Sequence, residues 1–151
     1  MPVEIRIVGA EKFGILARAL RQAADKDLQR ELAAGLNRAA VPLRAEAKAS
    51  ALAVLPRRGG LAARVAGARL TTKRRGGRNP RVRIEAKGMP QLRRIDRGSV
   101  RHLVYGHPPF VTQHVTAGWF TKPMEAGAPR VRAQMVRVLD EIARKIAAAI
   151  R

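Results

Sequence analysis

Apolar and polar residues alternate at the start of the chain, and the spacing then becomes helical. Val3, Ile5 and Ile7 alternate with polar neighbours as far as Gly9, which predicts a short strand with one apolar face. Apolar residues spaced three and four positions apart then predict a helix over residues 11–24.

A longer apolar stripe follows Asp25 and Asp27, and the side chain of either residue can cap a helix. The stripe predicts a second helix that runs toward Leu52. Its members are Leu28, Leu32, Leu36, Ala39, Leu43 and Ala47. Pro42 lies within the stripe, lacks a backbone N–H and crowds the carbonyl of Arg38. We therefore expect a bend or a break at Pro42.

The middle of the chain predicts short strands separated by turns. Residues 61–72 and 81–85 are expected to pair as a hairpin, because the second run alternates cleanly and the intervening KRRGGRNP favours a turn. The other predicted pieces are an irregular or short helical turn within 88–98, strands over 100–105 and 111–115, and a closing segment over 106–109.

The clearest helical pattern comes last. It predicts one continuous helix over residues 129–150, with Val131, Met135, Val138, Ile142, Ile146 and Ile150 on one face. The order of elements predicts an α+β fold: a small antiparallel sheet with a protruding basic hairpin, flanked by an Ala-rich N-terminal helical segment and a long C-terminal helix. We expect a single domain over 1–151, made of a strand and helices (1–55), a basic β region (56–120) and the C-terminal helix (121–151).

Composition favours a modest, aliphatic core. The chain has 151 residues, 46% of them hydrophobic, but aromatic residues are only 3%. We therefore expect Trp119 and Phe120 to lie in the core and not to serve as exposed anchors for a partner. There is no Cys, which excludes disulfides, thiol catalysis and cysteine-bound zinc. No apolar run approaches the roughly 20 residues that cross a membrane, so we expect no membrane partner, and Glu4 and Arg6 argue against a signal peptide.

Positive charge is concentrated in the middle of the chain. Residues 56–101 contain fifteen Lys and Arg against only Glu85 and Asp96, a net charge of +13 out of +20 for the whole chain. Repulsion of this size works against compaction, so the segment must face solvent or an acidic partner. The partner is either nucleic acid or an acidic protein surface.

The basic hairpin is the candidate contact site of this segment. Its cationic residues are Lys73, Arg74, Arg75, Arg78, Arg81 and Arg83. Gly76 and Gly77 make the tip pliable, so we expect it to project and to be ordered by a partner. Arginine pairs with carboxylates as well as phosphates. We favour an acidic face of a neighbouring subunit over a phosphate backbone, and a solvated tip is the third alternative.

Catalytic and metal-binding patterns are weak. His102, His107 and His114 are close in sequence, and three imidazoles can hold zinc. His102 and His107 would point to opposite faces of a strand, however, and no carboxylate is near to orient a ring. A nuclease would need clustered carboxylates to hold magnesium. We therefore expect no catalytic residues, no metal site and no cofactor, and we predict that the protein is not an enzyme.

Three short motifs occur in a characteristic order. They are LPRRGGL over 55–61, HLVYGHP over 102–108 and WFTKP over 119–123, the last leading into the C-terminal helix. With this order the chain resembles the neck or tail-completion proteins of long-tailed bacteriophages, the minor tail component family related to the lambda tail protein Z. The resemblance covers roughly residues 28–150.

The resemblance implies a structural virion protein of the head-to-tail neck, assembled in the host cytoplasm. It implies a hexameric or dodecameric ring around the DNA channel. Its partners would be portal-side connector proteins, tail proteins and double-stranded DNA in the lumen. A basic nucleic-acid-binding protein explains the charge equally well and remains the alternative, whereas the shortage of carboxylates disfavours a toxin-like or nuclease enzyme.

Overall fold

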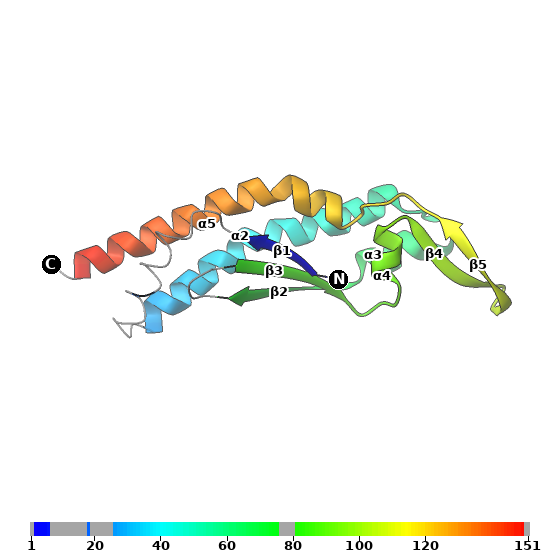
Figure 1. The fold of residues 1–151 in the computed structure, drawn as a ribbon, viewed down its shortest axis with the longest axis horizontal. Helices are drawn as coiled ribbons and strands as arrows, with labels where there is room; N and C mark the ends of the chain where they lie inside the picture. Colours follow the sequence, from blue (N-terminus) through cyan, green and yellow to red (C-terminus); the bar gives the residue numbers. More distant parts are fainter. Residues whose placement is uncertain (1, 7–17, 19–25, 76–80, 150–151) are drawn as a thin grey trace. The chain divides into compact units, whose positions relative to one another are not determined.

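The computed structural model describes residues 2–6, 18, 26–75 and 81–149, with all of their side chains except those of residues 2–6, 74, 75 and 81. The elements in chain order are β1 (Pro2–Arg6), α2 (Lys26–Val54), η1 (Arg58–Gly60), α3 (Leu61–Ala66), β2 (Arg69–Arg75), β3 (Arg81–Lys87), α4 (Leu92–Asp96), β4 (Ser99–Val104), β5 (His107–His114) and α5 (Thr121–Ala149) (Figure 1). This confirms the α+β class. The helix expected over 11–24 lies outside the described residues, except for Arg18, which is helical.

The chain divides into two compact units. The first unit comprises Met1–Val3, Leu43–Thr71 and Glu85–Ala126, and the second comprises Glu4–Pro42, Thr72–Ile84 and Gly127–Arg151. Helices α2 and α5 each contribute to both units, and α2 passes from one unit to the other directly after Pro42. The expectation of a single domain divided near residues 55 and 120 remains a prediction.

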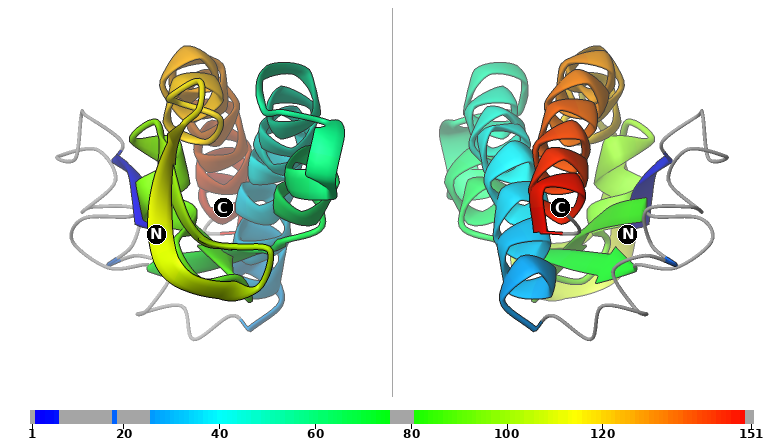
Figure 2. Two further views of the ribbon diagram at one scale, coloured as in Figure 1. Left: turned by 90° about the vertical axis from the view of Figure 1, so that its right-hand side faces the viewer. Right: turned by 90° about the vertical axis from the view of Figure 1, so that its left-hand side faces the viewer.

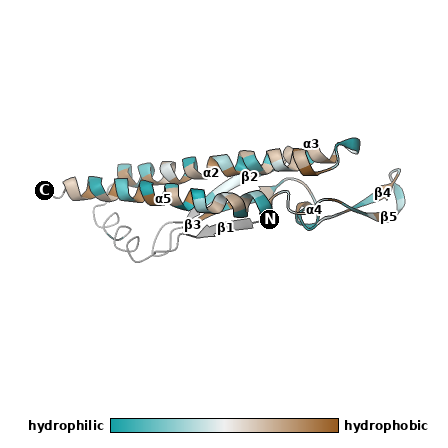
Figure 3. Ribbon diagram, turned by 90° about the horizontal axis from the view of Figure 1, so that it is seen from above, coloured by the Kyte–Doolittle hydropathy of each residue, from teal (hydrophilic) through white to brown (hydrophobic). Residues whose placement is uncertain are grey.

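Helix α2 confirms the helix that the apolar stripe after Asp27 predicts. Its buried residues are Gly35, Leu36, Ala39, Ala40, Leu43, Ala47 and Ala51. Figure 3 shows hydrophilic and hydrophobic residues interleaved along both long helices. The expected break at Pro42 is wrong, because α2 continues through it. Pro42 and Arg38 are both exposed, so water can satisfy the carbonyl that loses its donor. A bend at Pro42 remains a prediction.

Helix α5 begins at Thr121 and not at residue 129, so the predicted start is wrong. Pro123 lies in the first turn, where a backbone N–H has no partner within the helix. Pro129 lies inside the helix, where it removes only the bond to the carbonyl of Glu125, and both residues are exposed. Four residues of the predicted apolar stripe are buried, Val131, Met135, Ile142 and Ile146, whereas Val138 is half-buried and Leu139, which was not predicted, is buried beside it. Ile150 lies outside the described residues.

Within the second unit, α5 packs against α2. A Cβ added at Gly35 would lie only 2.5 Å from Cγ1 of Val138, so the absence of a side chain allows the two helices to approach closely. An ion pair between Lys145 and Glu31 joins the same two helices further along. Gly35 of α2 therefore leaves room for the larger side chain of Val138 of α5.

The predicted hairpin is partly correct. Strands β2 and β3 are neighbours in a three-stranded sheet of order β1-β3-β2. The start of the first strand is wrong, because Leu61–Ala66 forms helix α3. Alanine, leucine and arginine favour a helix over a strand, and Ala62 and Val65 bury one face of this turn. The left-handed backbone of Gly60, with φ of 78°, precedes the helix.

The strands predicted over 100–105 and 111–115 pair as an antiparallel ribbon, here called the β4–β5 ribbon (Figure 2). Its turn consists of Tyr105 and Gly106, with φ values of 49° and 80°, as two-residue hairpin turns prefer. The closing segment predicted over 106–109 is therefore wrong, because β5 already starts at His107. The short turn predicted within 88–98 is confirmed as α4.

The aromatic pair ahead of α5 lies in the core of the first unit. Trp119 and Phe120 are both fully buried, with ring centroids 5.3 Å apart. Such a tilted pair adds to the stability that burial of two large side chains gives. The core prediction for these two residues is therefore confirmed.

Candidate interaction surfaces

The structure describes only part of the basic hairpin. Lys73 of β2 and Arg83 of β3 are both exposed. Both take part in polar or electrostatic interactions within the protein, so neither is a free cation. Arg74, Arg75 and Arg81 belong to the strands, but their side chains lie outside the described set, as does all of Arg78. A projecting tip over 73–80 therefore remains a prediction.

The β4–β5 ribbon is the most exposed element of the described chain. All eight residues of β5 are exposed, and Val100 is the one buried residue of β4. Tyr105 at the turn keeps 96% of its surface exposed and Phe110 keeps 54%. A two-stranded ribbon is marginally stable without a surface that covers it. This element was not among the predicted contact sites.

One face of the ribbon combines an aromatic ring with a cation. Leu103 pairs with Phe110 and Arg101 pairs with Thr112, so these four side chains share a face. The guanidinium carbon of Arg101 lies 4.9 Å from the centroid of the Phe110 ring. At that distance the cation is attracted to the ring face. The ribbon thus presents a basic and aromatic surface.

The side chain of Gln91 holds the ribbon to α4. Its amide nitrogen donates to the carbonyl of Arg101 at 2.7 Å, and its amide oxygen accepts from the backbone N–H of Arg101 at 2.9 Å. The amide thereby pairs with the backbone N–H and C=O of Arg101, as a neighbouring strand would. Gln91 adopts a left-handed backbone, with φ of 67°, directly before α4. The base of the ribbon is closed where the N–H of Val115 donates to the carbonyl of Gly98 at 2.9 Å.

Asp96 fastens this region to the start of α5. One carboxylate oxygen accepts from the backbone N–H of Phe120 at 2.8 Å and from that of Thr121 at 3.1 Å. The Thr121 hydroxyl donates to the other oxygen. A carboxylate at the N-terminus of a helix satisfies free N–H groups and complements the helix dipole. Asp96, one of only two acids in the basic segment, is therefore buried for a structural reason.

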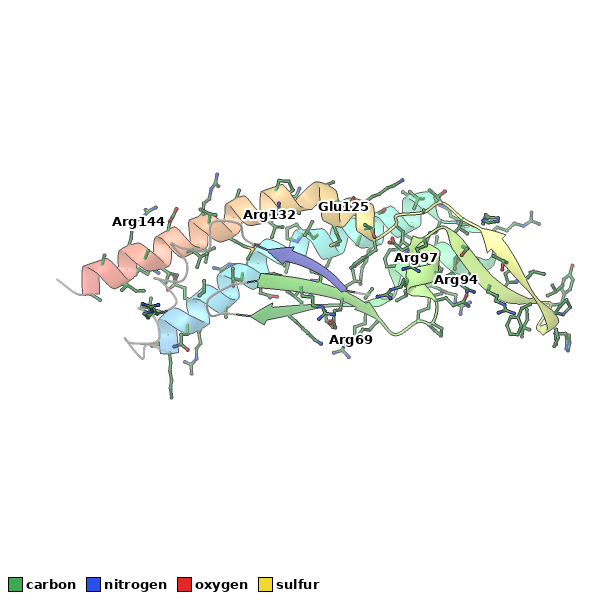
Figure 4. All side chains as sticks on the ribbon, viewed as in Figure 1. Arg69, Arg94, Arg97, Glu125, Arg132 and Arg144 are labelled. Atoms are coloured by element: carbon green, nitrogen blue, oxygen red, sulfur yellow. The ribbon has the colours of Figure 1, made fainter. Side chains whose placement is uncertain are left out.

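The exposed side of α4 carries a basic cleft. Its volume is about 450 Å³, and it is lined by Gln91, Arg93, Arg94, Arg97 and Ser99, which we call the arginine cleft. Figure 4 labels Arg94 on α4 and Arg97 directly after it. All three arginines are exposed, and none of them forms an ion pair with the described part of the chain. Sequence reasoning assigned these arginines only to the general basic segment.

The three histidines are spread along the ribbon. His114 pairs with Ser99 at its base, His102 pairs with Val111, and His107 pairs with Val104 beside the turn. All three are exposed. Among the described residues no group of three or more His, Cys, Asp or Glu is arranged to hold a metal ion.

Comparison with protein-family models, with curated proteins and with solved structures finds no match for this chain. None of the described helices combines the length and the apolar character needed to span a membrane. The arguments for function therefore rest on this chain's own surfaces and on the resemblance of its motifs.

Proposed function

We propose that this chain is a structural protein of a bacteriophage virion, which forms a ring at the head-to-tail neck around the DNA channel. The resemblance of the motifs over 55–61, 102–108 and 119–123 suggests this role. The observation that carries the proposal is the exposed surface of the β4–β5 ribbon. In a closed ring, a neighbouring subunit covers such a ribbon and protects its strand edges.

Tyr105 gives further support to a role of the ribbon in assembly. A bulky residue rarely adopts a left-handed backbone, and Asn or Gly would form the same turn with less strain. The ring of Tyr105 is nevertheless almost fully exposed, so it contributes no burial to its own chain. A large amphipathic side chain at the tip of an arm is suited to a pocket on a partner. The ribbon is thus the assembly arm of the proposed ring.

Oligomerisation of the full-length protein tests the proposal. Replacing Tyr105 and Phe110 together by Ser should abolish the ring, because both exposed aromatic anchors are lost. Replacing Leu52 and Val136 by Ser is the matched control, since they are exposed apolar residues of α2 and α5 that are 45% and 37% exposed. Native mass spectrometry should show a hexamer or dodecamer for the unmodified chain and for the control. A wild-type protein that stays monomeric with its neck partners present would contradict the proposal.

The basic hairpin serves as a second contact in this proposal, with its tip on an acidic face of a neighbouring subunit or ring. Portal-side connector proteins and tail proteins are the partners. Replacing Arg74, Arg75 and Arg78 by Ser should prevent tails from joining filled heads. Normal joining with loss of DNA retention would instead assign the hairpin to DNA, and no effect on either would mean that the tip is solvated.

A nucleic-acid-binding protein outside the virion is the second candidate. Its support is the net charge of +20 together with the unpaired arginines of the arginine cleft. Such a protein would be a monomer or dimer whose binding weakens steeply with salt. A ring by native mass spectrometry favours the first candidate, and a salt-sensitive monomer or dimer favours the second.

A further inference from the structure

The arginine cleft is a concentration of positive charge that has no acidic partner among the residues whose side chains are described. Arg93 and Arg94 belong to α4, and Arg97 caps its C-terminal end, four and three residues further on, so the three side chains lie at neighbouring positions. The acid of the same helix, Asp96, is buried and bound to Phe120 and Thr121. No carboxylate is among the described residues that line the cleft, and such a lining favours an anion as ligand.

The chemistry of the lining favours a phosphate group. Guanidinium groups match the oxygens of phosphate with paired N–H donors. Ser99 contributes a hydroxyl to the same lining, which can donate a further hydrogen bond. The described lining residues include no aromatic ring on which a base could stack. The cleft is therefore suited to a phosphate that belongs to a backbone and not to a nucleotide held by its base.

We propose that the arginine cleft binds the phosphodiester backbone of a nucleic-acid duplex without reading its sequence. Phosphate contacts from arginine, hydroxyl and amide groups position a protein on a duplex, and the absence of stacking groups argues against a single strand. The inference goes beyond the proposed function, because the cleft lies on α4 and binds a duplex whether or not the chain forms a ring. In a neck ring the duplex would be the DNA in the channel.

Salt-dependent duplex binding by the full-length protein tests the proposal. Arg93, Arg94 and Arg97 are replaced together by Gln, and the control replaces Arg38, Arg137 and Arg144, which are exposed arginines of α2 and α5 with the same total charge. The plot of log affinity against log salt concentration should become shallower by about 2.7 for the cleft variant, since each lost phosphate contact contributes about 0.9. The control should keep most of the wild-type slope. An equal loss in both variants, or in neither, would overturn the proposal.

A lysine variant separates charge from geometry. Replacing the three cleft arginines by Lys keeps the charge but removes the paired donors. The slope should stay close to that of the wild type while the affinity falls. If the Lys variant bound the duplex as tightly as the wild type, the arginines would make no bidentate contact with phosphate. Thermal unfolding of all variants should match the wild type, because the substituted side chains are exposed.

Competition identifies the source of the phosphate. A DNA duplex, an RNA duplex, inorganic phosphate and polyglutamate are each titrated against a labelled DNA duplex. Displacement by the DNA or the RNA duplex supports a site for the phosphate backbone, and the duplex that binds more tightly is the natural ligand. Displacement by inorganic phosphate at equal concentration would assign the cleft to a free ion, and displacement by polyglutamate of equal charge would assign it to an acidic protein; either result overturns the proposal. Native mass spectrometry of the same samples reports the ring separately, so the two proposals can fail independently.

Discussion

The β2–β3 hairpin and the β4–β5 ribbon are both two-stranded, but they differ in what they bury. Strand β3 buries Val82, Ile84 and Ala86, and it lies between β1 and β2 in its sheet. Strand β5 buries nothing and has a single neighbour. The more basic of the two is thus built into a sheet, and the less basic one carries the exposed aromatic residues. Charge density and availability for a partner are separate properties.

The comparison also shows how each element obtains its stability. The hairpin is held by apolar side chains that alternate toward a core. The ribbon is held at its base, by the amide of Gln91 on Arg101 and by the backbone bond between Val115 and Gly98. Substitutions should therefore destabilise the fold strongly in β3, moderately at the base of the ribbon, and least at its tip.

The largest effect is expected from a charge placed in β3. Ile84 is fully buried, so Ile84→Asp should lower the free energy of unfolding by more than about 4 kcal/mol, the effect of an unpaired charge in a core. Val111→Asp is the matched change in β5 and should lower it by about 1 kcal/mol or less. Urea denaturation followed by circular dichroism measures both. Similar losses at the two positions would remove the distinction between hairpin and ribbon.

Asp96 should have the next largest effect. Asp96→Ala leaves the buried N–H of Phe120 and the N–H of Thr121 without their acceptor, which should lower the free energy of unfolding by about 2–3 kcal/mol. Asp140→Ala is the control, because Asp140 is an exposed residue of α5 far from the helix start. That change should stay below about 0.5 kcal/mol. Equal losses would mean that the cap at α5 is not a stabilising contact.

The sequence predicts well those elements whose apolar spacing reflects burial on one side. The stripes of α2 and α5 and the alternation of β3 are of this kind, and most of their apolar members are buried. The exceptions are Leu139, which is buried in place of Val138, and Glu85, which is buried on the polar side of β3. Two predicted helix boundaries, a break at residue 42 and a start at residue 129, fall at prolines and are wrong. Pro42 and Pro129 both lie inside helices, because each is exposed and removes only one hydrogen bond. Residues 61–66 were mistaken for a strand because a single helical turn is too short to show a period.

The candidate surfaces were harder to predict, for a different reason. A ribbon exposed on both faces has no hydrophobic period, so its importance is not visible in the pattern. The sequence does contain one local indication of the ribbon. Tyr105 and Gly106 lie between two runs typical of strands, and a turn of two residues between such runs predicts a hairpin. The arginine cleft depends on Asp96 turning inward to meet Phe120 and Thr121, residues far along the chain. No local pattern reveals that contact.

A smaller effect is expected at the base of the ribbon. Gln91→Ala removes two hydrogen bonds to Arg101 and should lower stability by about 1 kcal/mol, with faster hydrogen exchange of the Arg101 amide. Gln91→Gly loses the same bonds but suits the φ of 67° better, so it should recover part of the stability while the exchange stays fast. Slow exchange in either variant would show that the glutamine amide does not hold the ribbon.

The smallest effect on stability is expected at the tip of the ribbon, in the substitution Tyr105→Asn. Asn followed by Gly106 is the preferred pair for a turn with two left-handed residues, so the variant should be as stable as the wild type or more stable by about 0.5 kcal/mol. If the ring of Tyr105 anchors a neighbouring subunit, the same variant should lower the fraction of ring seen by native mass spectrometry. Lower assembly together with equal or higher stability is an outcome that damage to the fold cannot produce. A variant that assembles normally would show that the tyrosine has no partner, and the assembly role would then fall to the remaining aromatic of the ribbon, Phe110, which Phe110→Ser tests alone.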